Sequence, residues 1–336
     1  MLYLHGIGHF HPENVMTNQF MEELGIGTDE EWIIERVGIR ERRTVLSLDY
    51  IRRTKNRDPR AAQEASVYTN AQTAAAAAMM AMQRAGIKKG DIGLVISGCC
   101  APSFSTPAEA ASVAAELGIE APCFDLNSAC TSFGMQVDFL NRMMPGSLPS
   151  YVLIVQPENI TRAIDFSDRS SAVLFGDGSA AAVLSGTVPS RVAFVEAKSG
   201  TKTSAWEKVM IPYGGHFNQD GHAVQGFAIR RMTESVNRLF NHNGTKKDGR
   251  FLFIGHQANL LALKTVCERA SISDENHWYN VDMLGNTGCA GAPGVLSARW
   301  DALQDGDRVA ICLVGAGLAW VELLLEVDGP VGKRNS

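Results

Sequence analysis

Short apolar runs and longer segments with helical spacing alternate along the first half of the chain. The apolar runs are typical of buried strands, and the helical spacing repeats every three to four residues between them. Strands are predicted at residues 91–98, 122–126, 151–155 and 172–185, the last interrupted by a glycine-rich turn. A helix is predicted at residues 107–117, and the alanine-rich stretch at 74–81 is read as a buried helix. This alternation predicts an α/β fold with a largely buried sheet.

The second half repeats the same theme. Its predicted strands and helices lie at residues 250–254, 258–270, 288–303, 308–314 and 320–326. Two similar α/β halves packed together are consistent with this weak internal symmetry. Gly186 and Pro189 break the pattern between the halves. We therefore expect two domains, residues 1–187 and 188–336.

Two polar stretches interrupt the pattern and are predicted to be loops or insertions. Residues 46–65 are dense in charge, and the part from 49 to 65 looks like an insertion before the alanine-rich helix. Residues 216–225 are rich in glycine and histidine. The simplest reading of such a charge run is a solvated face.

Composition excludes several classes of protein. The chain has 45% hydrophobic and 20% charged residues, as in an ordinary soluble globular protein, and its net charge of −5 argues against nucleic-acid binding. Its seven cysteines form no CxxC pair, which argues against a zinc or disulfide framework and for a reducing cytoplasm. No signal peptide or membrane-spanning stretch is predicted.

Cys130 is the first candidate for chemistry. It lies between small residues, after a predicted strand and before a helix whose apolar positions are Phe133, Val137, Leu140 and Met144. A helix N-terminus favours a thiolate, and a thiolate attacks acyl groups far better than a thiol does. The alternative is an inert buried cysteine, which is common.

Two further polar residues follow glycine-containing turns. His256 comes after the apolar run 251–254, and Asn286 comes after 281–284. Such positions at strand ends are where α/β sheets bind ligands. Histidine can move a proton or donate to an oxyanion, and asparagine can donate without changing charge. A structural histidine and an ordinary Asn-Thr-Gly turn are the competing readings.

Together these segments resemble the β-ketoacyl-acyl-carrier-protein synthase III family of condensing enzymes. The resemblance runs nearly end to end and includes six motifs in family order. The motifs lie at residues 29–42, 127–130, 175–178, 255–259, 285–287 and 315–317. The resemblance implies the five-layered αβαβα thiolase fold with two pseudo-symmetric halves, and a homodimer.

The resemblance also implies roles for individual residues. Cys130 matches the nucleophile acylated by an acyl-CoA, and His256 and Asn286 match the pair that binds the malonyl thioester and stabilises the enolate after loss of CO₂. The backbone N–H groups of Cys130 and Ala316 match the oxyanion hole. The coenzyme A site is matched by Trp32, Arg36 and Arg169. The second substrate is then malonyl-acyl carrier protein or malonyl-CoA, with no cofactor and no metal.

Three departures from the family suggest a specialised member. Thr106 stands where an aromatic residue often closes the partner subunit's acyl pocket, so a larger or more polar acyl group is expected. Leu261 replaces an arginine that assists carrier-protein docking, although Lys264 lies one turn on. The charged segment at 49–65 is the third. The starter, the extender and its carrier, and the pathway are left open.

Two other functions compete with condensation. An acyltransferase or thioesterase on the same scaffold would pass the acyl group to an alcohol, an amine or water. The presence of both His256 and Asn286 favours condensation, because that pair serves the decarboxylative step. A non-catalytic acyl-binding subunit is the other alternative, and such subunits usually lose one of the three catalytic residues.

Overall fold

One extended sheet runs through both halves of the chain in the computed structural model, which describes residues 1–242 and 249–328. Within these residues its nine strands lie in the order β11-β12-β13-β8-β1-β7-β6-β4-β5. The first half supplies β1 (Leu2–Phe10), β4 (Ile92–Ser97), β5 (Cys123–Asp125), β6 (Tyr151–Glu158) and β7 (Gly178–Ser185). The second half supplies β8 (Val192–Thr201), β11 (Phe251–Gly255), β12 (Arg308–Gly315) and β13 (Ala319–Val327). Only Leu2–Leu4 of β1 pair with β8, so the halves meet at a short seam.

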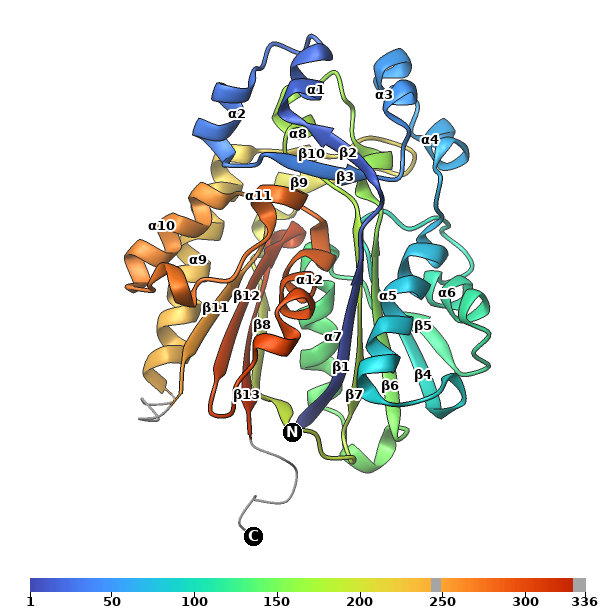
Figure 1. The fold of residues 1–336 in the computed structure, drawn as a ribbon, viewed down its shortest axis with the longest axis vertical. Helices are drawn as coiled ribbons and strands as arrows, with labels where there is room; N and C mark the ends of the chain where they lie inside the picture. The colour runs from blue at the N-terminus through green and yellow to red at the C-terminus, as the bar shows by residue number, and fades with distance from the viewer. Residues whose placement is uncertain (243–248, 329–336) are drawn as a thin grey trace.

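Helices cover both outer faces and fill the space between the halves (Figure 1). On the first half the outer face carries α5 (Asn70–Ala85) and α6 (Glu109–Leu117). On the second half it carries α9 (Gly221–His242) and α10 (Leu260–Ala270). The central core packs α7 (Ser132–Asn141) and α12 (Gly291–Ala298) against strands of both halves. The expected five-layered αβαβα thiolase-like fold is confirmed.

Close packing of β1 on α5 explains the alanine-rich stretch in the sequence. A Cβ atom at Gly6 would lie 2.2 Å from the carbonyl oxygen of Ala81, and one at Gly8 would lie 2.0 Å from that of Ala77. Larger side chains on either element would force strand and helix apart. Thr69 and Gln72 form a capping box at the start of α5, which fixes where the helix begins.

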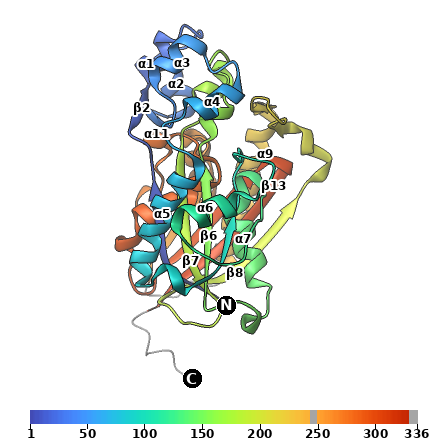
Figure 2. The same cartoon turned by 90° about the vertical axis from the view of Figure 1, so that its right-hand side faces the viewer.

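A cap of small elements covers one end of the layers, at the top in Figures 1 and 2. It contains β2 (Asn14–Thr17), α1 (Asn18–Glu23), α2 (Glu30–Val37), β3 (Glu41–Thr44), α3 (Leu48–Thr54) and α4 (Pro59–Ala65). The prediction of a loop over 46–65 was therefore wrong. The Ser47 hydroxyl accepts a hydrogen bond from Tyr50 N–H to cap α3, and Asp58 caps α4 ahead of Pro59.

The second predicted loop was also wrong. Residues 216–225 contain β10 (Asn218–Gln219), which pairs with β9 (Val209–Met210), and the start of α9. The Asp220 carboxylate accepts a hydrogen bond from Ala223 N–H and pairs with Lys208 at 3.0 Å. This acidic residue at the start of α9 satisfies one of the N–H groups that a helix leaves without a partner.

Three element boundaries also differ from expectation. The helix after Cys130 ends at Asn141, so Met144 lies outside it and is exposed. Residues 281–284 form a helical turn, α11 (Val281–Leu284), rather than the end of a strand. The expected helix at 288–303 is divided into a 3₁₀ turn, α12 and a second 3₁₀ turn. The domain boundary expected at 187/188 falls in the turn between β7 and β8 and stays a prediction.

No helix among residues 1–242 and 249–328 has both the length and the apolar character needed to cross a bilayer.

Candidate active site

Cys130 lies at the bottom of a cavity of about 470 Å³. It occupies a 3₁₀ turn, Ala129–Thr131, that leads directly into α7. Ala129 has a φ of 46°, in the left-handed region, and its N–H donates to Asn127 Oδ1 at 2.8 Å. A non-glycine residue held in this region is a local strain that the surrounding structure must enforce. The expected position near a helix N-terminus is confirmed.

The surroundings of Cys130 favour its thiolate. The Cys100 sulfur lies 3.6 Å from the Cys130 sulfur, and His256 is close to the same thiol. The hydrogen bond from Cys100, and then the neighbouring imidazole, hold the pKa of Cys130 well below its ordinary value, against the opposing effect of burial. A nucleophile in this state is ready to attack a thioester.

His256 follows the C-terminal end of β11, as predicted. The backbone N–H of His256 donates to the Cys312 carbonyl on β12 at 2.9 Å, which ties the residue to the neighbouring strand. The side chain is buried and lines the cavity with Cys130. Its Nδ1 atom has no hydrogen-bond partner among the described residues. Asn259 caps α10 through a 3.0 Å bond from Ala262 N–H, so a helix begins just beyond the histidine.

Asn286 presents its amide to the same cavity. The side-chain Oδ1 accepts a hydrogen bond from Gly288 N–H at 3.0 Å, and the backbone N–H of Asn286 donates to the Leu174 carbonyl at 2.7 Å. With the oxygen engaged, the NH₂ group is the part available to a ligand. Gly285 directly before it has φ 66° and ψ −163°, a conformation essentially restricted to glycine.

Gly315 lets the segment before Ala316 pack closely against Cys130. A Cβ atom at Gly315 would lie 3.1 Å from Cys130 Cβ, tighter than ordinary contact. Ala316 begins a 3₁₀ turn, Ala316–Leu318, and lines the cavity. The pairing of the Cys130 and Ala316 N–H groups as an oxyanion hole remains a prediction.

The open end of the cavity carries aromatic and cationic groups. The guanidinium carbons of Arg36 and Arg169 each lie 4.9 Å from the Trp32 ring centroid. Trp32 is partly buried, and both arginines are exposed. This arrangement can stack on a planar base and attract phosphates. The predicted site residues that line this one cavity are Trp32, Arg36, Cys130, Arg169, His256, Asn286 and Ala316.

Thr106 is the predicted residue that the structure does not bring to the cavity. It lies on an exposed loop and does not line this cavity. Its expected role was in the acyl pocket of a partner subunit, so that role stays a prediction.

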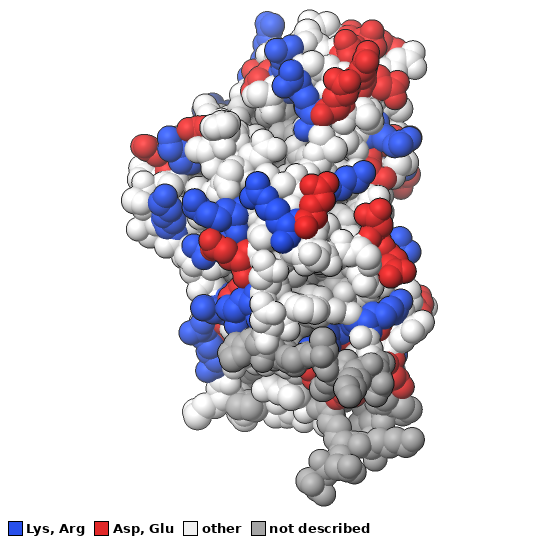
Figure 3. All heavy atoms as spheres, turned by 90° about the vertical axis from the view of Figure 1, so that its left-hand side faces the viewer, with Lys and Arg blue, Asp and Glu red and all other residues white. Residues whose placement is uncertain are grey.

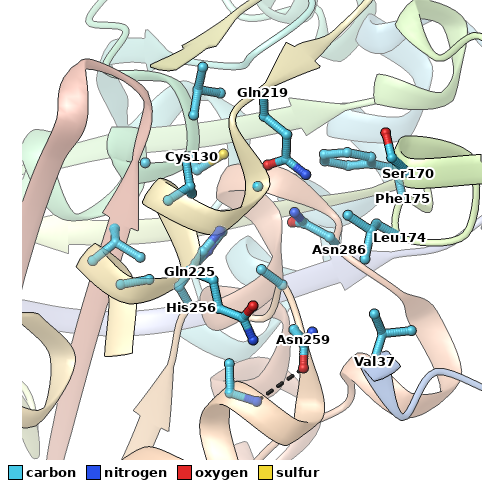
Figure 4. Close-up of a pocket in the computed structure, with 18 of the residues that line it drawn as sticks. Val37, Cys130, Ser170, Leu174, Phe175, Gln219, Gln225, His256, Asn259 and Asn286 are labelled. Atoms are coloured by element: carbon cyan, nitrogen blue, oxygen red, sulfur yellow. Dashed lines mark hydrogen bonds between the residues drawn. The ribbon is translucent and has the colours of Figure 1, made fainter. Parts of the chain in front are cut away.

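Other residues of the site were not foreseen. Gln219 and Gln225 line the cavity from β10 and the start of α9, and Figure 4 shows them near Cys130 and His256. Both belong to the stretch at 216–225 that was predicted as a loop. The two amide side chains in a segment rich in glycine and histidine were the feature of the sequence that could have pointed to a binding site.

Glu158, at the end of β6, is a fully buried carboxylate that sequence reasoning missed. It accepts a hydrogen bond from Cys100 N–H at 3.0 Å. Its Oε2 also accepts from Cys289 N–H at 3.2 Å and from the Cys289 thiol at 3.1 Å. Burial first, and then the charge of Cys130, raises the pKa of Glu158 to about 7. The carboxylate thus ties the Cys100 loop to the turn after Asn286. An acidic residue at the end of an apolar strand was the feature of the sequence that could have pointed to it.

A second cavity, of about 430 Å³, lies on the side of Cys100. Its lining includes Cys100, Arg60 and Arg162, together with the exposed aromatic side chains of Phe104 and Tyr213. Cys130 lines the first cavity and Cys100 lines the second, so the contact between the two sulfurs lies where the two cavities approach each other.

No cluster of three or more His, Cys, Asp or Glu side chains suited to a metal ion occurs among the residues that the structure describes.

Comparison with known proteins gives one consistent family. Residues 124–203 match the model for 3-oxoacyl-[acyl-carrier-protein (ACP)] synthase III, and residues 240–327 match the model for its C-terminal part. Beta-ketoacyl-[acyl-carrier-protein] synthase III from Coxiella burnetii is 28% identical and covers 96% of this chain and 98% of its own. Beta-ketoacyl-[acyl-carrier-protein] synthase III 2 from Vibrio vulnificus is 30% identical over 94% of this chain and 85% of its own.

A solved structure agrees in fold. The 3-oxoacyl-[acyl-carrier-protein] synthase III of Aquifex aeolicus superposes with a TM-score of 0.85 at 27% identity, covering 97% of this chain and 100% of the other.

Proposed function

We propose, since the chain belongs to the 3-oxoacyl-[acyl-carrier-protein] synthase III family, that Cys130, His256 and Asn286 carry out the acyl-primed decarboxylative condensation of a ketosynthase. The observation that carries this proposal is the meeting of these three side chains in one cavity (Figure 4). Membership of this family makes the enzyme a transferase, and its fold is of the thiolase type.

In the first half-reaction, the Cys130 thiolate attacks the carbonyl carbon of an acyl-CoA. The oxyanion that forms is bound by the N–H groups of Cys130 and Ala316, and collapse of the intermediate expels the coenzyme A thiolate. The low pKa of Cys130 supports this step, because the nucleophile needs no separate base.

In the second half-reaction, His256 and Asn286 donate to the thioester carbonyl of a malonyl group. Loss of CO₂ leaves an enolate whose negative charge these donors stabilise. The enolate carbon attacks the acyl-cysteine, and the Cys130 thiolate leaves. Bonds and electrons balance without a metal or organic cofactor. The anchored Oδ1 of Asn286 supports this role, because it turns the NH₂ group toward the ligand.

Trp32 and Arg169 bind the adenine of coenzyme A in this proposal, and Arg36 contacts its phosphates. Their place at the open end, with Cys130 at the bottom, supports entry of the pantetheine arm along the cavity. Lys264 and Arg269 of α10 are exposed. Figure 3 shows the face of the molecule formed by α2 and α10, and basic side chains are spread across its middle. A carrier protein, usually acidic, is expected on this face despite the absence of arginine at Leu261. Malonyl-CoA is the alternative donor.

We extend the proposal to a specialised homodimer of the cytoplasm. The edge strand β5 and the exposed Phe104 and Tyr213 beside the second cavity support coverage by a partner subunit. Seven free cysteines support a reducing compartment. Thr106, as the residue offered to the partner's acyl pocket, admits a larger or more polar acyl group than an aromatic residue would.

Intact-protein mass spectrometry with a panel of acyl-CoAs tests this assignment. The wild-type protein should gain one acyl group, with the preferred chain length and polarity revealed by the panel, and Cys130→Ala should gain none. Cys267→Ala, a buried cysteine on α10 outside both cavities, is the matched control and should load normally. Acylation that persists in Cys130→Ala at the wild-type rate would show that another residue is the nucleophile.

A further inference from the structure

Cys100 is a second thiol of the active site to which condensation gives no covalent role. It lies in the loop between β4 and α6, with its sulfur 3.6 Å from that of Cys130. A disulfide has an S–S distance of about 2.05 Å, so the two sulfurs need to approach by only about 1.5 Å. The backbone N–H of Cys100 donates to Glu158, which fixes the backbone of the loop that carries the thiol.

The two thiols are reached from different sides. Cys130 lines the first cavity, and the partly exposed Cys100 lines the second. A thiolate is oxidised more readily than a thiol, so a small oxidant entering the first cavity meets the more reactive sulfur first. Cys100 is then the thiol in contact with the oxidised sulfur.

The other nearby cysteines are poorly suited to this role. Cys289 is buried, and its single S–H proton already has two acceptors within reach, Glu158 at 3.1 Å and the Gly98 carbonyl at 3.2 Å. Cys99 is 2% exposed, next to Cys100 in the chain, and lines neither cavity. Among the cysteines that the structure describes, Cys100 and Cys130 are the pair joined by a hydrogen bond between their sulfurs.

We propose that Cys100 and Cys130 form a reversible disulfide when a hydroperoxide oxidises the nucleophile. The Cys130 thiolate attacks one peroxide oxygen, the O–O bond breaks, and the leaving oxygen takes up a proton to give water or an alcohol. The Cys100 sulfur then attacks the sulfur of the resulting Cys130 sulfenic acid, and the S–O bond breaks. The departing hydroxide takes the proton of the Cys100 thiol and leaves as water. Two thiols are oxidised by two electrons and the hydroperoxide is reduced.

This modification blocks acylation while it lasts and protects Cys130 from over-oxidation. Without a resolving thiol, a sulfenic acid proceeds to the sulfinic acid, which dithiothreitol does not reduce. The proposal rests on the geometry of the two sulfurs and not on the proposed condensation, so the two can fail separately.

The test exposes the folded full chain to hydrogen peroxide, with mass spectrometry of non-reduced peptides. The wild-type protein should lose two hydrogens and yield a Cys100–Cys130 cross-linked peptide. After dithiothreitol, alkylation of Cys130 by iodoacetamide should return to the level of the untreated protein. Cys100→Ser should instead gain two oxygens at Cys130 and not recover, while Cys267→Ser should behave as wild type.

Two results would overturn the proposal. One is a wild-type protein that accumulates Cys130 sulfinic acid at the same rate as Cys100→Ser. The other is a disulfide that joins Cys130 to a different cysteine. If Cys100→Ser does not fold, the wild-type peptide map decides alone: a Cys100–Cys130 peptide supports the proposal, and Cys130 sulfinic acid without that peptide overturns it.

Discussion

At the scale of single residues, the site works by leaving particular atoms free. Asn286 has its Oδ1 occupied by Gly288 N–H and its NH₂ turned to the cavity. Cys130 receives a hydrogen bond from Cys100, and its pKa is low although it is buried. Both arrangements prepare charge stabilisation before a substrate arrives, which is the main way that enzymes lower barriers of this kind.

Removal of the Asn286 amide should separate the two half-reactions. We expect Asn286→Ala to reduce condensation by about 10² to 10³-fold, the usual effect of losing one oxyanion donor. Transfer of the acyl group from acyl-CoA to Cys130 should stay near the wild-type rate, measured by the mass of the acyl-enzyme. Equal loss of both steps would place Asn286 in the first half-reaction instead.

The buried carboxyl of Glu158 predicts a pH dependence of stability. Its pKa is raised from 4.5 to about 7, so between these values the folded state binds more protons than the unfolded state. Stability therefore falls as pH rises through this window, by an amount on the order of 3 kcal/mol for a fully buried group. Glu158→Gln cannot ionise and should lose this dependence.

Urea unfolding of both proteins at several pH values between 5 and 8 checks this prediction. The difference between them is the useful quantity, because burial lowers the pKa of His11 and His277 to about 4, and those groups act in the opposite direction. The free energy of unfolding of Glu158→Gln should rise relative to wild type as pH rises. Parallel curves would show that Glu158 is ionised throughout.

At the scale of elements, turns position the reactive side chains. Gly285 and Gly176 allow the turn before Asn286 to pack against the segment that leads into β7, and a Cβ at Gly176 would lie 2.2 Å from the Leu284 carbonyl oxygen. The turn before α12 and the turn before α7 both begin with a 3₁₀ segment, and both meet at the site.

Gly285→Ala should disrupt the site through this turn. A Cβ there has an unfavourable φ of 66° and would lie 2.7 Å from the Leu174 carbonyl oxygen, the group that holds Asn286 N–H. We expect a loss of stability of about 1–3 kcal/mol and near-complete loss of condensation. Gly25→Ala is the matched control, because Gly25 has the same φ of 66° with no atom within 4 Å, so only the backbone strain applies. Equal activity in the two variants would contradict this role of the turn.

Local patterns predicted much of the fold but not the tertiary contacts within the site. Strands such as 151–155 were predictable, and so was the place of Cys130 near a helix N-terminus, because apolar periodicity and a special residue between strand and helix are local signals. The helices α3 and α4 were missed although Ser47 and Asp58 are recognisable caps, since charge density was taken to indicate a loop. The contact between Cys100 and Cys130 was not predictable, because it depends on how two loops pack at the ends of neighbouring strands.

At the scale of the whole molecule, one cavity connects the cap to the layered core. Trp32 on α2 lies at its open end, and Cys130 on the central layer lies at its bottom. In the proposed function, recognition of coenzyme A and the chemical steps are therefore carried by different parts of the fold.

Trp32→Ala should weaken the use of acyl-CoA and spare shorter donors. Loss of stacking on the adenine is expected to raise the KM for acyl-CoA by about 10-fold, the effect of roughly 1–2 kcal/mol. Acyl-pantetheine lacks the nucleotide and should load Cys130 equally well in both proteins, as measured by the rate of acyl-enzyme formation. A parallel loss with both donors would mean that Trp32 supports the structure of the site rather than the nucleotide.

The most direct test is a single turnover of the isolated acyl-enzyme. Protein acylated at Cys130 and freed of excess acyl-CoA is mixed with a malonyl thioester labelled in its free carboxyl. We expect the acyl group to leave the protein at the rate at which labelled CO₂ appears, in equal amounts, with a β-ketoacyl thioester as product. Loss of the acyl group without CO₂, or to water or an alcohol, would contradict the proposed condensation.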